Sequence, residues 1–104
     1  MSAHFLTILR PTRANFPASA TDEERAIVAR HFEYLQNPPR GLTVLMAGRT
    51  DEASPMGLVV FVADSLEHAE AFALGDPAVR DGVFQAEVHP YLLALCGQDY
   101  PSEA

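Results

Sequence analysis

The sequence has few cysteines and few basic residues, and each shortage excludes a class of protein. Cys96 is the only cysteine, so the chain cannot form an internal disulfide bond, which is typical of a reducing compartment. Seven basic residues stand against 14 acidic ones, and the formal net charge is −7. This charge argues against a nucleic-acid binder, which needs a basic surface to displace counterions from phosphates, and against binding to anionic membranes.

Long apolar runs are absent as well. No run approaches the roughly 20 residues that a helix needs to cross a bilayer. The first residues, Met1 to His4, lack the basic region and apolar run of a signal peptide. We therefore expect a cytoplasmic protein whose partners are neither nucleic acids nor membranes.

What the chain does contain is typical of one small folded domain. It has 104 residues, of which 48% are hydrophobic and 20% charged, a composition too apolar for a disordered chain. Residues 97–104 are polar and show no periodicity. We expect a single domain over residues 1–96 and a flexible C-terminal tail over residues 97–104.

The first half of the chain predicts a strand, a long loop and a helix. Residues 4–10 are rich in strand-forming residues, and Pro11 ends them. Residues 12–20 are typical of a loop, longer than most connections. A helix follows from Thr21, where Thr21 and Glu24 have the spacing of a capping box, and residues 37–39, Asn-Pro-Pro, end it.

The apolar spacing of this helix predicts which side chains face the core. Apolar residues recur at helical intervals at Ile27, Val28, Phe32, Tyr34 and Leu35. His31 lies four residues after Ile27 and four before Leu35, so it shares their inward stripe.

The second half begins with two clear strands, residues 42–47 and 58–63, joined by a loop over 48–57. In the later strand Leu58, Val60 and Val62 face one way and Val59, Phe61 and Ala63 the other, so both faces are apolar. A sheet with one face in water should alternate between apolar and polar residues. We therefore expect something to cover each face.

A helix, a short helix and a last strand complete the prediction. Asp64 and Glu67 suggest a second capping box before a helix that ends near Gly75. Asp76 can cap a short helix with Pro77 at its first position. Residues 83–95 read as the last strand, at an edge or bent, because Pro90 interrupts it and cannot donate to a neighbouring strand.

The order strand–helix–strand–strand–helix–strand predicts an α+β domain of the ferredoxin-like βαββαβ type, with a four-stranded antiparallel sheet and both helices on one face. The other sheet face stays apolar, and exposed patches of that size mark interaction sites. We expect a homodimer in which the two open sheet faces pack together. The alternative is a monomer whose tail and long loop cover the sheet.

His31 and Asp76 are the two residues best suited to act together chemically. A carboxylate can accept a hydrogen bond from one imidazole nitrogen, fix the tautomer and leave the other nitrogen to move a proton near neutral pH. The alternative is a core histidine satisfied by a backbone carbonyl and an aspartate that only caps a helix. The spacing leaves both interpretations open.

Other polar residues give weaker signals. Arg49, at a strand end, has the chemistry to hold an anionic group. Glu87 and His89 project from one strand face, but two ligands without a third do not make a metal site. Cys96 has no cationic neighbour to activate it, and no phosphate-binding glycine pattern appears. We expect neither a metal nor a cofactor.

Four short motifs together resemble the YciI-like (YCII-related domain) family. They are, in order, residues 31–35 (His-Phe-Glu-Tyr-Leu), 46–49 (Met-Ala-Gly-Arg), 76–84 (beginning Asp-Pro-Ala-Val and ending Gly-Val-Phe) and 88–91 (Val-His-Pro-Tyr). The resemblance extends from the first strand to Leu95, and it depends on the order and spacing of the motifs.

This resemblance implies a ferredoxin-like fold assembled as a dimeric α+β barrel, with an active-site histidine and aspartate at His31 and Asp76. Some relatives act as dehydrochlorinases on chlorinated hydroxyquinols. The chain departs from the family where many relatives have Arg-Pro-Ala before the histidine, because it has Val28-Ala29-Arg30 there. An anion-binding role of that arginine is either lost or moved to Arg30.

Two functions follow as hypotheses. The first is a cofactor-free enzyme in which His31 is the general acid or base, Asp76 orients it, and Arg49 or Tyr34 contacts a small aromatic or acidic substrate in an elimination, isomerisation or lyase reaction. The second is a non-catalytic module of the same dimeric fold that binds a small ligand or a partner protein.

Overall fold

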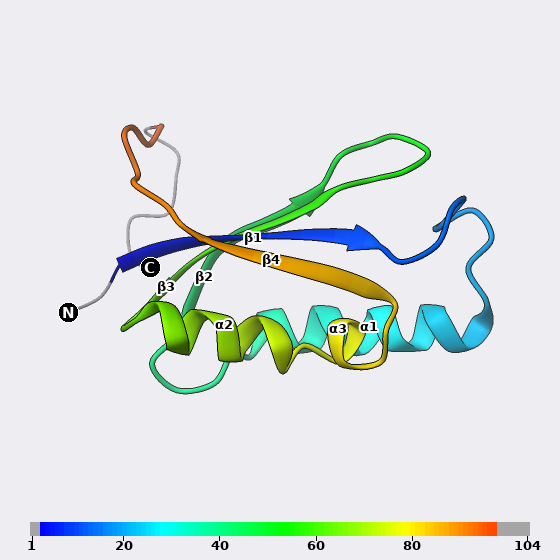
Figure 1. Ribbon diagram of the computed structural model, residues 1–104, viewed down its shortest axis with the longest axis horizontal. Helices are drawn as coiled ribbons and strands as arrows, with labels where there is room; N and C mark the ends of the chain where they lie inside the picture. The colour runs from blue at the N-terminus through cyan, green and yellow to red at the C-terminus, as the bar shows by residue number, and fades with distance from the viewer. Residues whose placement is uncertain (1–2, 98–104) are drawn as a thin grey trace.

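A computed structural model describes residues 3–97 and shows one antiparallel sheet with helices on a single face (Figure 1). The chain runs in the order β1 (Ala3–Pro11), α1 (Asp22–Gln36), β2 (Thr43–Arg49), β3 (Gly57–Ala63), α2 (Leu66–Leu74), α3 (Pro77–Arg80) and β4 (Phe84–Pro90). The strand order in the sheet is β2-β3-β1-β4, and all three pairings are antiparallel. The predicted α+β, ferredoxin-like arrangement is confirmed.

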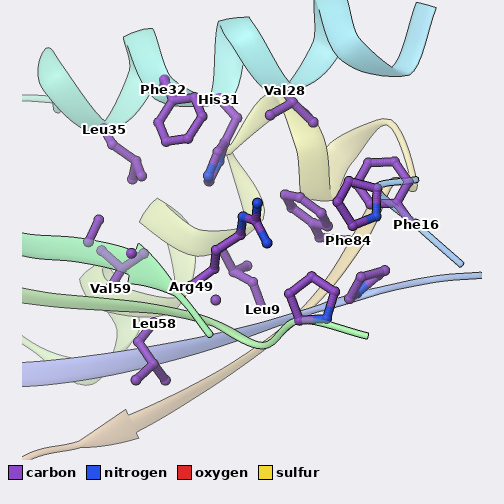
Figure 2. Close-up of a pocket in the computed structure, with 16 residues that line it drawn as sticks. Leu9, Phe16, Val28, His31, Phe32, Leu35, Arg49, Leu58, Val59 and Phe84 are labelled. Carbon is purple, nitrogen blue, oxygen red and sulfur yellow. The ribbon is translucent and has the colours of Figure 1, made fainter. Parts of the chain in front are cut away.

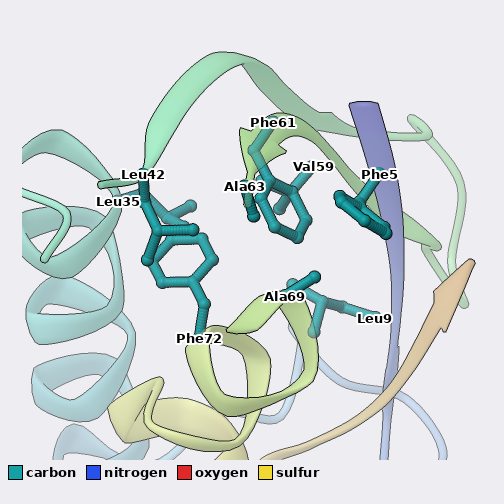
Figure 3. Close-up of a cluster of buried hydrophobic side chains, with 9 residues drawn as sticks. All are labelled: Phe5, Leu9, Leu35, Leu42, Val59, Phe61, Ala63, Ala69 and Phe72. Atoms are coloured by element: carbon teal, nitrogen blue, oxygen red, sulfur yellow. The ribbon is translucent and has the colours of Figure 1, made fainter. Parts of the chain in front are cut away.

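The core lies between the sheet and the helices, and alternation along the strands builds it. In β3, Val59, Phe61 and Ala63 point to the helices and are buried, and Phe61 is fully enclosed. Its ring lies 5.1 Å from the ring of Phe72 on α2. Figure 3 shows this cluster, which consists of Phe5, Leu9, Leu35, Leu42, Val59, Phe61, Ala63, Ala69 and Phe72.

No helix of the described residues covers the other sheet face (Figure 1), which is apolar along β2 and β3 and polar at the β4 edge, where Gln85, Glu87 and His89 lie. Leu58 is 37% exposed on this face, and Val60 and Val62 are half-buried. Met46, which pairs with Val60 across β2 and β3, is 51% exposed.

Within residues 3–97, no helix has the length and apolar character that crossing a membrane requires.

Helix α1 begins and faces the core as predicted, with one exception. The Thr21 hydroxyl accepts from the backbone N–H of Glu24, and the Glu24 carboxylate accepts from the N–H of Thr21. Ile27, His31 and Leu35 are its buried residues. Phe32 lies beside that stripe rather than on it and is 56% exposed, because it is one residue, or about 100° of helix, past His31.

The second capping box was predicted in the wrong register. Ser65, not Asp64, caps α2, and its hydroxyl accepts from the N–H of His68. Because a histidine stands three residues after the cap, no carboxylate reaches back to complete the box. The short helix α3 agrees with the prediction: Asp76 caps it, Pro77 opens it, and Gly82 follows it at a φ of +79°.

The last strand is shorter than the predicted span 83–95. Strand β4 is an edge strand, as expected, but it ends at Pro90, opposite Phe5 of β1. Among residues 91–97, the N–H of Tyr91 alone still donates to β1, at the carbonyl of His4, since β1 itself begins at Ala3. Residues 91–97 follow without regular structure, and the predicted tail beyond them lies outside the described residues.

The loop over residues 12–20 is tied to the start of α1 through Arg13. Its guanidinium donates to both Glu24 carboxylate oxygens, at 3.1 and 2.6 Å, and to the backbone oxygen and hydroxyl of Ser19, each at 2.8 Å. These bonds hold Phe16, which is 5% exposed, against the body of the domain. Glu24 accepts hydrogen bonds from Arg13 and from the Thr21 N–H, and these bonds lower its pKa from 4.5 to about 2, with the bond from Arg13 making the larger contribution.

We expect Phe61→Ala to lower the free energy of unfolding by about 3–5 kcal/mol, because it opens a cavity in a fully enclosed part of the core. Denaturant unfolding measures the change. Leu92→Ala is the control, since Leu92 is 94% exposed and its truncation should change stability little. Equal losses in the two variants would contradict the assignment of the core.

We expect Glu24→Gln to remove part of the acid sensitivity of the fold. The folded-state pKa of Glu24 is depressed, so its stabilisation is present above about pH 4.5 and is lost as the pH falls toward 2. Unfolding midpoints at pH 6 and pH 3 should therefore differ less in this variant than in wild type. Glu23→Gln, in the same helical turn, is the control, and the prediction fails if both variants respond to acid alike.

Candidate active site

His31 and Asp76, 45 residues apart in the chain, form a direct hydrogen bond. Nδ1 of His31 lies 2.6 Å from Oδ2 of Asp76, and the two side chains are only 7% and 5% exposed. His31 reaches this point from the inward stripe of α1, and Asp76 from the turn between α2 and α3. The contact between α1 and α3 is therefore what brings the two groups together.

The carboxylate of Asp76 is held at both oxygens. Oδ2 faces His31, and Oδ1 accepts from the backbone N–H of Ala78 at 2.9 Å, which is the capping bond of α3. An ionised carboxylate can only accept a hydrogen bond, so the imidazole carries its hydrogen at Nδ1 and donates it to Oδ2. Nε2 is then the nitrogen with a free lone pair, and it belongs to a side chain that lines a cavity.

Buried polar side chains are few and gather at this place. Within residues 3–97 they are Thr7, His31 and Asp76. Thr7 stands between Phe5 and Leu9 on the helix-facing side of β1, and with Asp76 it lines a void of about 10 Å³, close to the size of one water molecule. The sequence signal for Thr7 was available, since it is a polar residue at an inward position of an alternating strand.

The cavity beside His31 has a volume of about 410 Å³ and is almost entirely apolar. It lies between α1, the ends of the strands and the loop that carries Phe16 (Figure 2). Its walls are formed by Leu9, Pro11, Phe16, Pro17, Val28, His31, Phe32, Leu35, Ala47, Gly48, Arg49, Pro55, Gly57, Leu58, Val59 and Phe84. The His31 ring packs between Phe32, at 5.3 Å, and Phe84, edge-on at 5.5 Å.

Among the described residues that line the cavity, Arg49 alone has a permanent charge. It stands at the end of β2, and Figure 2 shows its guanidinium extending into the cavity on the side toward α1. Its one hydrogen bond within residues 3–97 is long, 3.4 Å from Nη1 to the carbonyl of Thr50. The group is exposed and therefore able to pair with an incoming anion.

Tyr34 and Arg30, the other two residues considered for substrate contact, lie away from the cavity. The Tyr34 hydroxyl donates to the carbonyl of Phe72 at 2.8 Å, and the two rings stack at 5.0 Å. Burial, with the negative charge of Asp76, raises the pKa of Tyr34. Arg30 is exposed and lies 4.0 Å from the carboxylate of Asp81.

Glu87 and His89 of β4, considered above as a weak metal-binding pair, do not act together in the structure. The Glu87 carboxylate lies 2.5 Å from the guanidinium of Arg10 on β1, and His89 is exposed. Over residues 3–97 the structure contains no cluster of three or more side chains able to hold a metal ion. Cys96 is free and exposed.

Comparison with known proteins supports the assignment of the fold. The family model of the YCII-related domain matches residues 5–91. A solved structure, described as the de novo designed protein Foldit4, is similar with a TM-score of 0.52 and 15% sequence identity, covering 90% of this chain and 100% of that one, which shows a shared fold alone. A search among curated proteins finds no match. The family match spans most of the chain, and the chain therefore belongs to the YCII-related domain family.

Proposed function

We propose that this protein is a small enzyme that moves a proton on a ring-shaped, anionic substrate, with His31 as general base and acid and Asp76 as the residue that orients it. The observation that carries the proposal is the buried 2.6 Å bond between the two side chains, with the histidine at the wall of an apolar cavity. A histidine oriented in this way can act as a general base and then as a general acid.

The chemistry begins at Nε2 of His31, which takes a proton from a carbon of the substrate. In an elimination, the electron pair of that C–H bond forms a double bond while the leaving group departs with its own bonding pair. In an isomerisation, the imidazolium returns the proton at another carbon. Asp76 stabilises the imidazolium in both reactions, and both are redox-neutral.

The cavity supports a compact substrate with one charged end. Its volume is at the lower end of the range for small-molecule sites, and its walls carry Phe16, Phe32 and Phe84, against which a ring can pack. Arg49 offers a planar fork of donors for a carboxylate or phenolate. The substrate class that fits is an unsaturated or aromatic ring with one anionic group.

A second function, binding without turnover, has one observation in its favour. Of the residues between 3 and 97 that line the cavity, only His31 and Arg49 carry an ionisable side chain. One proton-transfer group and one cation also suit a site that holds a ring-shaped acid without reacting with it. Turnover separates the two functions, because a binding module holds the same ligands and leaves them unchanged.

We expect His31→Gln and Asp76→Asn each to lower turnover by about 10²–10⁴-fold, the usual contribution of a general base. Asn offers a donor to Nδ1, so it turns the imidazole to the tautomer that has no lone pair at Nε2. The assay incubates the protein in D₂O with a panel of unsaturated and hydroxylated ring acids and follows loss of C–H signals by NMR. A substrate is first identified with the wild type.

Glu33→Gln is the matched control, since Glu33 is an exposed carboxylate on the same helix. Circular dichroism establishes that each variant is folded. Turnover within twofold of wild type in both site variants would refute the catalytic pair, and ligand binding without any turnover by the wild type would favour the binding module.

We further propose that the protein is a homodimer formed through its open sheet faces, supported by the uncovered apolar side chains on β2 and β3. Light scattering should give twice the chain mass of 11.3 kDa. Val60→Asp, which places a charge at the centre of this face, should give a monomer. Leu74→Asp, at an exposed leucine on the helical side, should leave the dimer intact. A monomeric wild type would overturn the assembly.

A further inference from the structure

A second hollow lies next to the His31 cavity, on the other side of Phe32. It has a volume of about 490 Å³ and lies between the C-terminal half of α1 and the edge strand β2. Phe32, Leu35 and Ala47 line both spaces. The two hollows are therefore neighbours that share a wall.

Phe32 supplies most of that wall. Leu35 belongs to the inward stripe of α1 and is 8% exposed, so it forms part of the floor. Ala47 contributes a single methyl group from the strand side. Phe32 is 56% exposed as a residue, and its ring lies next to that of His31, with the two ring centres 5.3 Å apart. Figure 2 shows the ring on α1, flanked by His31 and Leu35.

The second hollow suits an uncharged apolar chain. Pro38, Leu42 and Val44 line it together with the shared residues, and its polar side chains, within the part of the chain that the structure describes, are Gln36 and Thr43. Joining it to the His31 cavity would roughly double the continuous space. A ligand with a ring beside His31 would then have room for an alkyl tail that extends along β2.

We propose that Phe32 is a specificity-determining residue: its ring closes the His31 cavity toward β2 and restricts the site to single-ring acids without a long apolar tail. The inference rests on the ligand site of the proposed function. It concerns binding alone, so it does not depend on whether His31 performs catalysis.

The test measures binding of benzoate and 4-pentylbenzoate by isothermal titration calorimetry. In wild type, the Phe32 ring should block the pentyl tail, so 4-pentylbenzoate should bind no more tightly than benzoate. Each buried methylene is worth about fourfold in affinity, so Phe32→Ala should bind 4-pentylbenzoate at least tenfold more tightly than wild type does. Benzoate itself packs against the Phe32 ring in the proposed site, so its affinity should not rise in Phe32→Ala, and the ratio of 4-pentylbenzoate affinity to benzoate affinity should increase at least tenfold.

Two control variants separate removal of the wall from general loosening. Val28→Ala enlarges the His31 cavity but leaves the wall in place, because Val28 lines only the first space, so it should not favour the pentyl compound. Phe32→Tyr keeps the ring and should retain wild-type selectivity. Phe32→Val is a second opening variant, used if the alanine variant is unstable.

Phenol and 4-pentylphenol, run in parallel, distinguish failure of this inference from failure of the proposed function. If Phe32→Ala binds 4-pentylphenol more tightly than wild type does, and neither benzoate binds, the result supports the role of Phe32 in closing the cavity and contradicts anion binding by Arg49. If benzoate binds but Phe32→Ala does not increase the affinity for either pentyl compound, the proposed role of Phe32 is wrong and the proposed function is not contradicted. Absence of binding by all four compounds in every variant overturns both.

Discussion

The hydrogen bond between His31 and Asp76 is the constraint on which the rest of the structure depends. Both groups are almost fully buried, and a buried polar group without a partner costs more than its hydrogen bond contributes. Each oxygen of Asp76 has its own donor, one on α1 and one in the first turn of α3. Helix α1 must therefore pack against α3 at one position along its length. The same bond that orients the proposed base also fixes how the helices lie on the sheet.

Stability alone is a weak reason for placing an imidazole and a carboxylate there. Buried ionisable pairs are often no more stabilising than apolar side chains of the same volume. The surroundings are apolar, with Phe84 edge-on to the His31 ring and Leu9 and Leu35 lining the same cavity, so an apolar pair would leave only the N–H of Ala78 without its acceptor. What an apolar pair cannot supply is a ring nitrogen at the wall of a cavity that also contains a guanidinium. This difference favours a chemical role for the pair over a purely structural one.

Local chemistry made both members of the pair predictable, while their neighbours depended on tertiary packing. The stripe of Ile27, His31 and Leu35 and the cap at Asp76 follow from helical spacing and turn residues. Both Phe32 and Tyr34 were expected in the core-facing stripe, but Phe32 is 56% exposed beside the cavity and Tyr34, also named as a candidate substrate contact, packs against Phe72. They lie on opposite sides of the stripe, about 100° one way and roughly 60° the other. Spacing cannot tell which side faces α2 and which faces the cavity, because that depends on how α1 is placed on the sheet.

The open sheet face and the cavity meet at the start of β3, which links the proposed assembly to the proposed ligand site. Leu58 lines the cavity, yet strand alternation puts its side chain on the open face with Val60, and Figure 2 shows it on the side of the strands away from α1. Gly57, beside it, allows a close approach, since a β-carbon there would lie 3.3 Å from that of Leu9. A second copy packed on the open face would contact Leu58 at this end of β3. In the proposed dimer, the same residue would therefore lie at both the subunit interface and the ligand site.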